Sequence, residues 1–441
     1  MNAYFEMENG FYFIPCLGIM AKCDNNIPDF SVLNNIIGYN HEKFMKVDFV
    51  DSQNAFPTKL SVFLSDSCNL KCSYCYYGSG GKSKEIELSI DDLDIIINSL
   101  IKNAKMRKLM GYDYQIDVLL TGGGEPTCNW KNFSYFVVNV KQRAFENGIP
   151  VNVSLVTNGV LNKKQIDFVC NHVDSIQVSY DGLSDIQNKN RRCVDGSASS
   201  DVVEQTMKEL SIRNKNFFVR STIMPCDYKR IYEMAREIFG QYSNAIRYHI
   251  EPIQYTGRAN DFEKDTEKDN EIFIAEYIRT QKMVLKNFSD RKFYSSLFDY
   301  KITNISCSSI TGESPVIDNR GKIFPCSDRL DFQTHGIGQI LDGKIQIKNK
   351  SYYEAQYYGL LQTECGNCCY FSLCGGGCPS SFRRDSTGNL LPEGKVKCDL
   401  LKKYWNIAFS KLCNEYSFLE LYLELDRKED DWEIYKIQCK V

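Results

Sequence analysis

The sequence predicts an α/β protein in which a parallel sheet is followed by a cysteine-rich module. Strand-like and helix-like stretches alternate six times between Lys59 and Phe288, which is typical of βα units and a parallel sheet. After about Ser289 this alternation ends, and short strand-like stretches, glycines and cysteines dominate up to Cys398. We therefore expect two differently organised parts, the second of them held together by metal.

Four segments are expected along the chain. They are an N-terminal segment at 1–56, the alternating region at 57–288, the cysteine-rich module at 289–398 and a C-terminal part at 399–441. The first is rich in aromatic residues and predicts a hairpin around Tyr12–Ile14 and Gly18–Met20. The last predicts a helix over Leu400–Tyr416, followed by a polar and aromatic tail without a clear assignment.

The alternating region supplies the individual elements of the sheet. Six stretches predict strands: Lys59–Leu64, Ile116–Leu120, Val151–Val156, Ser175–Ser179, Phe217–Ile223 and Arg247–Glu251. Amphipathic patterns between them predict helices over Ser89–Lys105, Asn132–Asn147, Lys163–Asn171, Asp201–Arg213 and Tyr228–Phe239. Ser89 and Asp92 predict a capping box at the start of the first helix. Parallel strands of this kind place functional loops at their C-terminal ends.

Composition excludes several classes of protein. The 441 residues are 43% hydrophobic and 25% charged, which is ordinary for a soluble globular protein. A net charge of −3 gives no electrostatic reason to expect nucleic acid or an acidic membrane as a partner. The chain has no run of 18 apolar residues and no signal-peptide pattern at its start, so we expect a cytoplasmic protein.

Cysteine usage points to metal binding. There are 19 cysteines and only 4 histidines. In a reducing compartment clustered cysteines are more often metal ligands than disulfides. Three lie within 68–75 and six within 365–398, and this close spacing lets one loop place several sulfurs around one metal centre.

The first cluster follows the first predicted strand and has the spacing Cys68-x3-Cys72-x2-Cys75. Three thiolates cannot saturate a [4Fe–4S] cluster, so one iron stays open for a ligand from outside the protein. The alternative is a structural zinc site. Zinc would require a fourth protein ligand nearby, and no histidine lies in this loop.

With Tyr74 before its third cysteine, this cluster resembles the signature of the radical S-adenosylmethionine (SAM) superfamily. The resemblance implies a partial (β/α)6 TIM-type barrel and a [4Fe–4S] cluster on Cys68, Cys72 and Cys75. It further implies that the open iron binds the amino and carboxylate groups of SAM. One electron from the cluster then cleaves SAM to a 5′-deoxyadenosyl radical.

The run Gly122-Gly123-Gly124-Glu125-Pro126 follows the second predicted strand and resembles the family's Gly-Gly-Glu-Pro motif. The resemblance implies contact with the SAM amino group, and glycines allow the close backbone approach that this requires. Taken alone, the run is also consistent with a plain tight turn.

Other SAM-binding positions follow from the same resemblance: Tyr74, Asn158, Ser179, Asp181 and Arg191. Ser179 and Arg191 would hold the SAM carboxylate, for which the planar guanidinium is suited, and Arg192 is the alternative to Arg191. For Asn158 and Asp181 an ordinary loop or capping role remains open. Arg220 and Glu251 are expected near the mouth of the barrel.

Seven downstream cysteines have the spacing of the SPASM domain, the auxiliary-cluster module of radical SAM enzymes that mature peptides and proteins. By this resemblance one auxiliary [4Fe–4S] cluster uses Cys365, Cys368, Cys374 and Cys398, and the other uses Cys307, Cys326 and Cys378. The total is then three clusters, one that binds SAM and two that are auxiliary.

Glu313 departs from the pattern of some relatives, the anaerobic sulfatase-maturating enzymes among them, which have a further cysteine six places after the first. The auxiliary cluster on Cys307 would then have an open position, where a substrate cysteine could bind and be joined to a carbon radical as a thioether. Cys369 is either a spare thiol or a replacement ligand. Cys128, just past the glycine-rich run, is the remaining thiol with a candidate catalytic role.

The leading interpretation is a maturase that abstracts hydrogen from a ribosomally made peptide and forms a thioether or another side-chain crosslink. Residues 1–56 could dock a leader peptide by strand addition, and a flavodoxin or ferredoxin would supply electrons. The alternatives are formylglycine formation in a sulfatase, a pathway to a small molecule or quinone cofactor, and an iron–sulfur electron carrier or zinc protein without SAM chemistry. The last would leave Gly122–Pro126, Ser179 and Arg191 unexplained.

Overall fold

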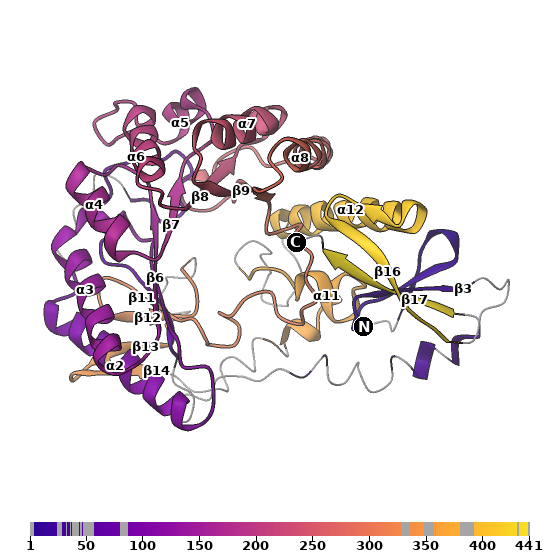
Figure 1. The fold of residues 1–441 in the computed structure, drawn as a ribbon, viewed down its shortest axis with the longest axis horizontal. Coiled ribbons are helices and arrows are strands. Elements are labelled where there is room, and N and C mark those ends of the chain that lie inside the picture. The colour runs from indigo at the N-terminus through magenta and orange to yellow at the C-terminus, as the bar shows by residue number, and fades with distance from the viewer. Residues whose placement is uncertain are drawn as a thin grey trace.

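The computed structural model describes residues 4–23, 29–31, 33–35, 37, 44, 46, 57–79, 87–327, 336–347, 357, 359–379, 392–429 and 432–439. Within these residues the strands form two sheets, one of eleven strands and one of six. The larger sheet is curved, and Figure 1 shows helices along its convex side.

Six parallel strands form the centre of the large sheet and neighbour one another in chain order. They are β4 (Lys59–Val62), β5 (Ile116–Leu120), β6 (Val151–Thr157), β7 (Ser175–Ser179), β8 (Phe217–Ile223) and β9 (Ala245–Pro252). All six strands predicted from the sequence are thereby confirmed. Their carboxyl ends lie at one edge of the sheet, as parallel order requires.

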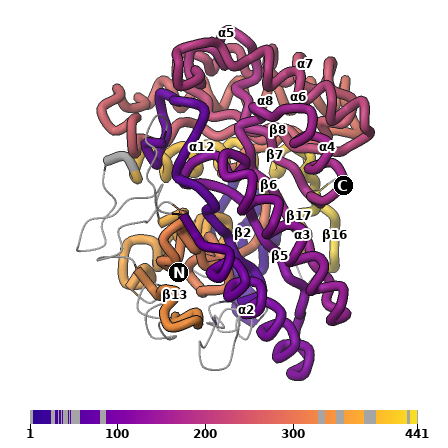
Figure 2. Tube along the Cα trace, turned by 90° about the vertical axis from the view of Figure 1, so that its left-hand side faces the viewer, coloured from indigo at the N-terminus to yellow at the C-terminus, as the bar shows by residue number. Residues whose placement is uncertain are grey.

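Helices connect these strands and cover the convex face, which Figure 2 views directly. They are α2 (Ile90–Leu109), α3 (Trp130–Glu146), α4 (Lys163–His172), α5 (Ser184–Asn190), α6 (Ser200–Ile212), α7 (Ile231–Gln241) and α8 (Glu267–Asn287). Short 3-10 turns lie at η2 (Pro126–Cys128), η3 (Pro225–Arg230) and η4 (Gly257–Ala259). The capping box predicted at Ser89 and Asp92 is present, since each side chain bonds the other's backbone N–H.

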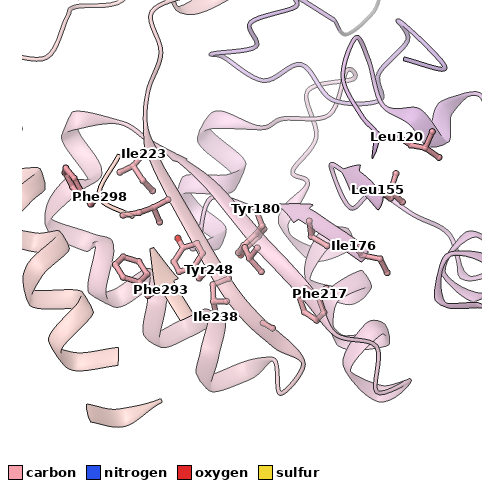
Figure 3. Packing of buried hydrophobic residues seen from close by; sticks show 14 of the residues in the cluster. Leu120, Leu155, Ile176, Tyr180, Phe217, Ile223, Ile238, Tyr248, Phe293 and Phe298 are labelled. Atoms are coloured by element: carbon pink, nitrogen blue, oxygen red, sulfur yellow. The ribbon is translucent and has the colours of Figure 1, made fainter. Parts of the chain in front are cut away.

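The core between this sheet and its helices is built by alternation along each strand. In β8, for example, Phe217, Val219, Ser221 and Ile223 are buried, while the residues between them are half-buried on the concave side. Figure 3 shows Phe217 and Tyr248 of the strands together with Ile238 of α7 in one packed layer. Burial of each such side chain contributes about 1.5–3 kcal/mol to the stability of the fold. This packing holds the strands, and the loops that follow them, in place.

The large sheet also continues into the cysteine-rich segment. At one edge β10 (Lys292–Tyr294) pairs in parallel with β9. At the other edge β11 (Val316–Ile317) pairs in parallel with β4, followed by the antiparallel strands β12 (Lys322–Phe324), β13 (Gly338–Leu341) and β14 (Lys344–Ile347). Strands on both sides of residue 288 therefore belong to one sheet.

The six-stranded sheet is antiparallel and joins the two ends of the chain. Its order is β1 (Phe5–Glu6), β2 (Phe11–Ile14), β3 (Ile19–Cys23), β17 (Trp432–Cys439), β16 (Leu421–Glu429) and β15 (Ser417–Phe418). The predicted N-terminal hairpin is confirmed as β2 and β3. The tail that has no clear assignment in the sequence forms β16 and β17. The sequence gives no signal for them because β3, the partner of β17, lies about 400 residues away in the chain. Much of the rest of the 1–56 segment lies outside the described residues.

A long helix, α12 (Pro392–Glu415), packs between the two sheets. Phe409 of α12 lies 4.7 Å, ring to ring, from Phe13 of the small sheet, and Tyr404 stacks at 4.0 Å on Phe298, which follows β10. The helix predicted over Leu400–Tyr416 is confirmed and begins earlier than expected. Two short elements, η5 (Glu364–Asn367) and α11 (Phe371–Cys374), precede it, and η1 (Glu8–Gly10) lies in the N-terminal segment.

Candidate active site

Four of the loops that follow the parallel strands carry the residues singled out from the sequence. The Cys68–Cys75 loop follows β4, the glycine-rich run follows β5, Asn158 follows β6 and Asp181 follows β7. The order of the strands therefore places these loops side by side at one edge of the sheet. This is the arrangement that parallel strands predict.

The cysteine loop is held on one side by the segment after α5. Leu70 forms a β-bridge with Cys193, and the N–H groups of Lys71 and Ser73 donate to the carbonyls of Arg192 and Asn190. Burial raises the pKa of Cys68 to about 12 and that of Cys72 to about 11. Only a bound cation such as an iron centre would hold these thiols as thiolates at neutral pH.

The same loop is held on its other side by Arg258 of η4. The guanidinium donates to the carbonyl of Cys72 at 2.7 Å, to that of Gly78 at 3.0 Å and to that of Ser79. The backbone N–H of Arg258 donates to the carbonyl of Cys75 at 3.1 Å. Sequence reasoning missed this residue, which follows the last parallel strand and lies 186 positions from Cys72. The sequence around it, Gly257-Arg258 a few residues after β9, has no feature that singles out Arg258.

The glycine-rich turn packs directly on the cysteine loop. Gly122 and Gly123 have positive φ angles of 48° and 75°. A Cβ on Gly124 would lie 2.0 Å from the carbonyl oxygen of Ser67, so only glycine fits there. The N–H groups of Gly124 and Glu125 donate to the carbonyls of Ser65 and Ser67, each at 2.8 Å. The run is thus a cradle for the cysteine loop and more than an isolated tight turn.

Glu125 is buried beneath this turn, and its side chain ties the turn to the loop after β6. Its carboxylate accepts hydrogen bonds from the N–H and hydroxyl of Thr127, from the hydroxyl of Thr157 at 2.9 Å and from the N–H of Asn158 at 2.7 Å. Burial raises its pKa, which the four hydrogen bonds oppose. Asn158 in turn donates to Asn69 at 2.6 Å and contacts the Cys68 sulfur at 3.6 Å. Both residues therefore position the cysteine loop.

Asp181 forms a buried ion pair with Arg191. Asp181 is fully buried and Arg191 is 9% exposed. The Arg191 Nε atom lies 3.0 Å from Asp181 Oδ1, and the Tyr74 hydroxyl donates to Asp181 Oδ2 at 2.5 Å. The guanidinium also lies 5.3 Å from the centre of the Tyr74 ring. Arg192, the alternative considered from the sequence, is exposed and donates to the carbonyl of Gly196.

Polar residues continue along the concave face of the neighbouring strands. Ser179, Arg220 and His249 are in register on β7, β8 and β9. His249 lies 2.6 Å from Glu251, which also accepts the N–H of Ser296 at 2.6 Å. Burial alone would raise the pKa of Glu251, but the bond with His249, the hydrogen bond from Ser296 and the charge of Arg220 lower it to about 2. Arg220 and Glu251, which are expected near the mouth of the barrel, thus lie on the neighbouring strands β8 and β9.

A second site is built from the downstream cysteines. Four of them line one cavity together with Tyr370, Phe371, Gly376, Leu401 and Lys402; these cysteines are Cys365, Cys368, Cys374 and Cys398. They are the four residues that the resemblance to the SPASM domain assigns to one cluster. Burial raises the pKa of Cys374 to about 12, whereas a hydrogen bond from the neighbouring Cys369 lowers that of Cys368 to about 6.

The third set of cysteines is brought only partly together. The segment before Cys307 lies against the turn after α11, since a Cβ on Gly375 would lie 2.3 Å from the backbone of Ser306. The N–H of Thr303 also donates to Ser372 at 2.7 Å. Cys326 follows β12, and the grouping of Cys307, Cys326 and Cys378 stays a prediction. Glu313 is exposed. Cys128 is exposed at the end of η2.

Two general features complete the description. Among the described residues, no three His, Cys, Asp or Glu side chains converge on a point that could hold a single metal ion. Four thiols of the second site line one cavity together. In the described ranges, no helix has the length and apolar character needed to cross a membrane.

The chain is similar to known proteins. The model of the radical SAM superfamily matches residues 62–238. The cysteine-type anaerobic sulfatase-maturating enzyme of Clostridium perfringens (strain ATCC 13124) is 22% identical over 79% of this chain and 95% of its own length. The radical SAM cyclopropyl synthase TigE of Paramaledivibacter caminithermalis is 22% identical over 84% of this chain and 77% of its own.

Solved structures show the same fold. The native enzyme anSMEcpe with bound AdoMet superposes with a TM-score of 0.61 at 17% identity, covering 81% of this chain and 100% of its own. Streptococcus suis SuiB superposes with a TM-score of 0.52 at 16% identity, covering 83% and 85%. The α/β fold class expected from the sequence is confirmed.

Proposed function

We propose that this chain, which contains a radical SAM domain and is homologous to anaerobic sulfatase-maturating enzymes and peptide maturases, modifies a peptide by abstracting a hydrogen atom from it. One observation carries the proposal. A three-cysteine loop is clamped between a glycine turn and a buried Asp181–Arg191 pair, and a second cavity is lined by four more cysteines. This arrangement provides for SAM cleavage and for electron transfer in one chain.

Cys68, Cys72 and Cys75 would hold the first [4Fe–4S] cluster. The donor set fits this group, because three thiols come from one loop and leave a fourth coordination position for SAM. When bound and reduced, the cluster supplies the electron that cleaves SAM to the 5′-deoxyadenosyl radical. The chain's own contribution is to hold the loop: Gly124 allows the close approach of its backbone, and Arg258 fixes its carbonyls.

SAM itself would bind along the same edge of the sheet. Within the described residues Arg191 uses Nε for Asp181, so its two Nη atoms are the groups we assign to the SAM carboxylate, together with Ser179. Asp181 holds the guanidinium in place, and Tyr74 supports both through its hydroxyl and ring. The carbonyls of Gly122 and Gly123 are the groups we assign to the amino group.

The auxiliary clusters would take up the electron that product formation releases. The cavity lined by Cys365, Cys368, Cys374 and Cys398 supports one of them. We assign the other to Cys307, Cys326 and Cys378, with an open position where Glu313 stands in place of a cysteine. A substrate cysteine bound there would be placed for thioether formation, which is the crosslink we favour.

Further parts of the proposal concern partners and location. The enzyme would act in the cytoplasm, where thiols stay reduced and a flavodoxin or ferredoxin can donate electrons. A leader peptide would dock on the N-terminal segment by strand addition. The described strands of this segment belong to the small sheet, whose outermost strand at that end is the short β1.

Formylglycine formation in a sulfatase is the second candidate. The anaerobic sulfatase-maturating enzyme of Clostridium perfringens matches along 95% of its length, which supports this candidate. The product distinguishes the two functions. A thioether retains the cysteine sulfur in a new bond, whereas formylglycine has lost it.

The test uses anaerobically reconstituted protein, a strong reductant, SAM and synthetic peptides that contain cysteine. Wild type should form 5′-deoxyadenosine, and Cys72→Ala should form none. Cys374→Ala should retain some SAM cleavage but lose the modified peptide, as followed by mass spectrometry. Intact SAM in the presence of bound iron would favour an electron carrier, and bound zinc without iron would overturn the proposal.

A further inference from the structure

Lys397 of α12 is a buried lysine without a partner. The residue is 6% exposed, and its Nζ atom has no hydrogen-bond partner among the residues that the structure describes. A charged ammonium is stable in such a place only when an acceptor is supplied, and its three N–H donors are unused here. The chain therefore presents a strong donor that nothing in the described protein satisfies.

Burial lowers the pKa of Lys397, and two nearby carboxylates, those of Asp265 and Glu251, oppose that shift by their charges. Both are engaged elsewhere. Asp265 accepts hydrogen bonds from the hydroxyls of Tyr228, at 3.0 Å, and Tyr255. Glu251 is bonded to the side chain of His249 and to the N–H of Ser296. These carboxylates hold the ammonium near them electrostatically but leave its hydrogen-bond donors free.

The position of Lys397 links the two cysteine sites. Its neighbour in the chain is Cys398, which lines the four-cysteine cavity. On the other side, Tyr255, which is bonded to Asp265, belongs to the small apolar cluster that also contains Tyr74 of the cysteine loop. Glu251 lies near the end of β9, at the same edge of the sheet as the loops of the candidate active site. Lys397 is thus adjacent in the chain to a residue of the four-cysteine cavity, and the carboxylates that act on it belong to the part of the chain near the candidate active site.

We propose that Lys397 binds a carboxylate of the peptide substrate, either an acidic side chain or the C-terminus, and so orients the peptide between the two sites. This inference rests on the peptide-modifying function proposed above. A carboxylate is the one anionic group that an unmodified peptide carries at neutral pH, and an ammonium is a compact donor that can bind it by charge-assisted hydrogen bonds. A buried charge pair of this kind fixes the position of the peptide along the enzyme more strongly than a neutral contact would.

The experiment compares two matched pools of short synthetic peptides that contain cysteine. One pool carries Asp and Glu and an unblocked C-terminus. The other carries Asn and Gln and an amidated C-terminus. The anaerobically reconstituted full chain with SAM should retain the acidic pool over the amide pool by about tenfold or more, as measured by equilibrium dialysis and mass spectrometry. Lys397→Met should lose that preference, and Lys397→Arg should recover part of it.

The control is Lys395→Met, which removes an exposed lysine from the same helix and should keep the preference. Iron content and melting temperature show whether Lys397→Met is folded. A lysine without a partner predicts a melting temperature equal to or above that of wild type, because an apolar side chain replaces a buried charge. Equal retention of the two pools by wild type, no retention of either, or a preference kept by Lys397→Met would overturn the inference. Failure of wild type to cleave SAM would instead contradict the proposed function.

Discussion

At the scale of single residues, Asp181 and Arg191 form a buried ion pair in which each charge depends on the other for compensation. Sequence spacing offers Arg191 and Arg192 as alternative candidates. The structure separates them, since Arg191 is buried against a fully buried carboxylate and Arg192 is exposed. Removing the guanidinium of Arg191 would leave Asp181 as an uncompensated buried charge.

We therefore predict that Arg191→Met lowers the free energy of unfolding by about 3–5 kcal/mol and weakens SAM binding. Arg192→Met should change stability by no more than about 0.5 kcal/mol, as is usual for an exposed site. Urea unfolding and SAM titration of both variants measure this. Equal effects of the two substitutions would show that the buried pair has been misassigned.

Glu251 gives a prediction in pH. Its pKa is lowered from 4.5 to about 2, so the charged form stabilises the folded chain above pH 4.5, and this contribution is lost as the pH falls toward 2. Glu251→Gln should cost about 1–3 kcal/mol at pH 7, because the amide replaces one acceptor by a donor facing His249 or Ser296. The difference from wild type should shrink by about 1 kcal/mol on going from about pH 7 to about pH 4, as followed by chemical unfolding. A difference that grows with acidity would contradict the assigned shift.

The sequence reveals residues of this kind unevenly. The cysteines can be identified from their spacing, and Asp181 and Arg191 from the resemblance to the radical SAM superfamily. The role of Glu125 as a clamp, the reach of Arg258 and the isolation of Lys397 depend on contacts between distant segments. Spacing along one chain carries no information on such contacts.

At the scale of elements, the loops after β4 and β5 act as one unit. The backbone of Gly124 lies so close to Ser67 that a methyl group would separate the two loops. The cysteine loop would then be free to move relative to the turn that cradles it. The packing of these two loops therefore positions the three cysteines that we propose as ligands of the first cluster.

Gly124→Ala should therefore lose iron from the first cluster and lose SAM cleavage, although no thiol has been changed. Gly240 in α7 is the matched control, since a Cβ there meets nothing within 4 Å. Gly240→Ala should keep full iron content and gain about 0.5–1 kcal/mol of stability. Iron analysis and 5′-deoxyadenosine formation distinguish these outcomes, and an active Gly124→Ala enzyme would show that the close approach is unnecessary.

The parallel strands and their helices can be predicted because their signal is local. Apolar periodicity and caps such as Ser89 are fixed within a few residues, and all six strands follow from them. The strands β11 to β14 cannot be assigned in this way, since they are short and gain their stability from pairing with β4 and with one another. β16 and β17 escape prediction for the same reason, although the partner there is β3.

At the scale of the whole molecule, the two ends of the chain fold as one sheet. Trp432 of β17 is 1% exposed, lies 5.4 Å from the Tyr12 ring of β2 and donates to the carbonyl of Asp29 at 3.0 Å. The N-terminal strands thus pair and pack directly with the C-terminal strands. A leader peptide that binds there would meet a sheet that both ends of the chain stabilise.

Trp432→Ala should cost about 3–5 kcal/mol, because a large buried ring is removed from the contact between the two ends. Leu425→Ala on β16, where the side chain is 47% exposed, is the control and should cost little. Urea unfolding measures both, and limited proteolysis should cut the N-terminal segment faster in the Trp432 variant alone. A small effect at Trp432 would mean that the ends fold independently.

The proposed function depends most on an iron that the three cysteines Cys68, Cys72 and Cys75 would leave open for SAM. Electron paramagnetic resonance of the reduced, anaerobically reconstituted protein tests it directly, using SAM whose carboxylate carries ¹⁷O. We predict that the labelled SAM broadens a [4Fe–4S] signal that is present in wild type and absent in Cys72→Ala. A signal unchanged by SAM, or one that persists without Cys72, would contradict the assignment of this site.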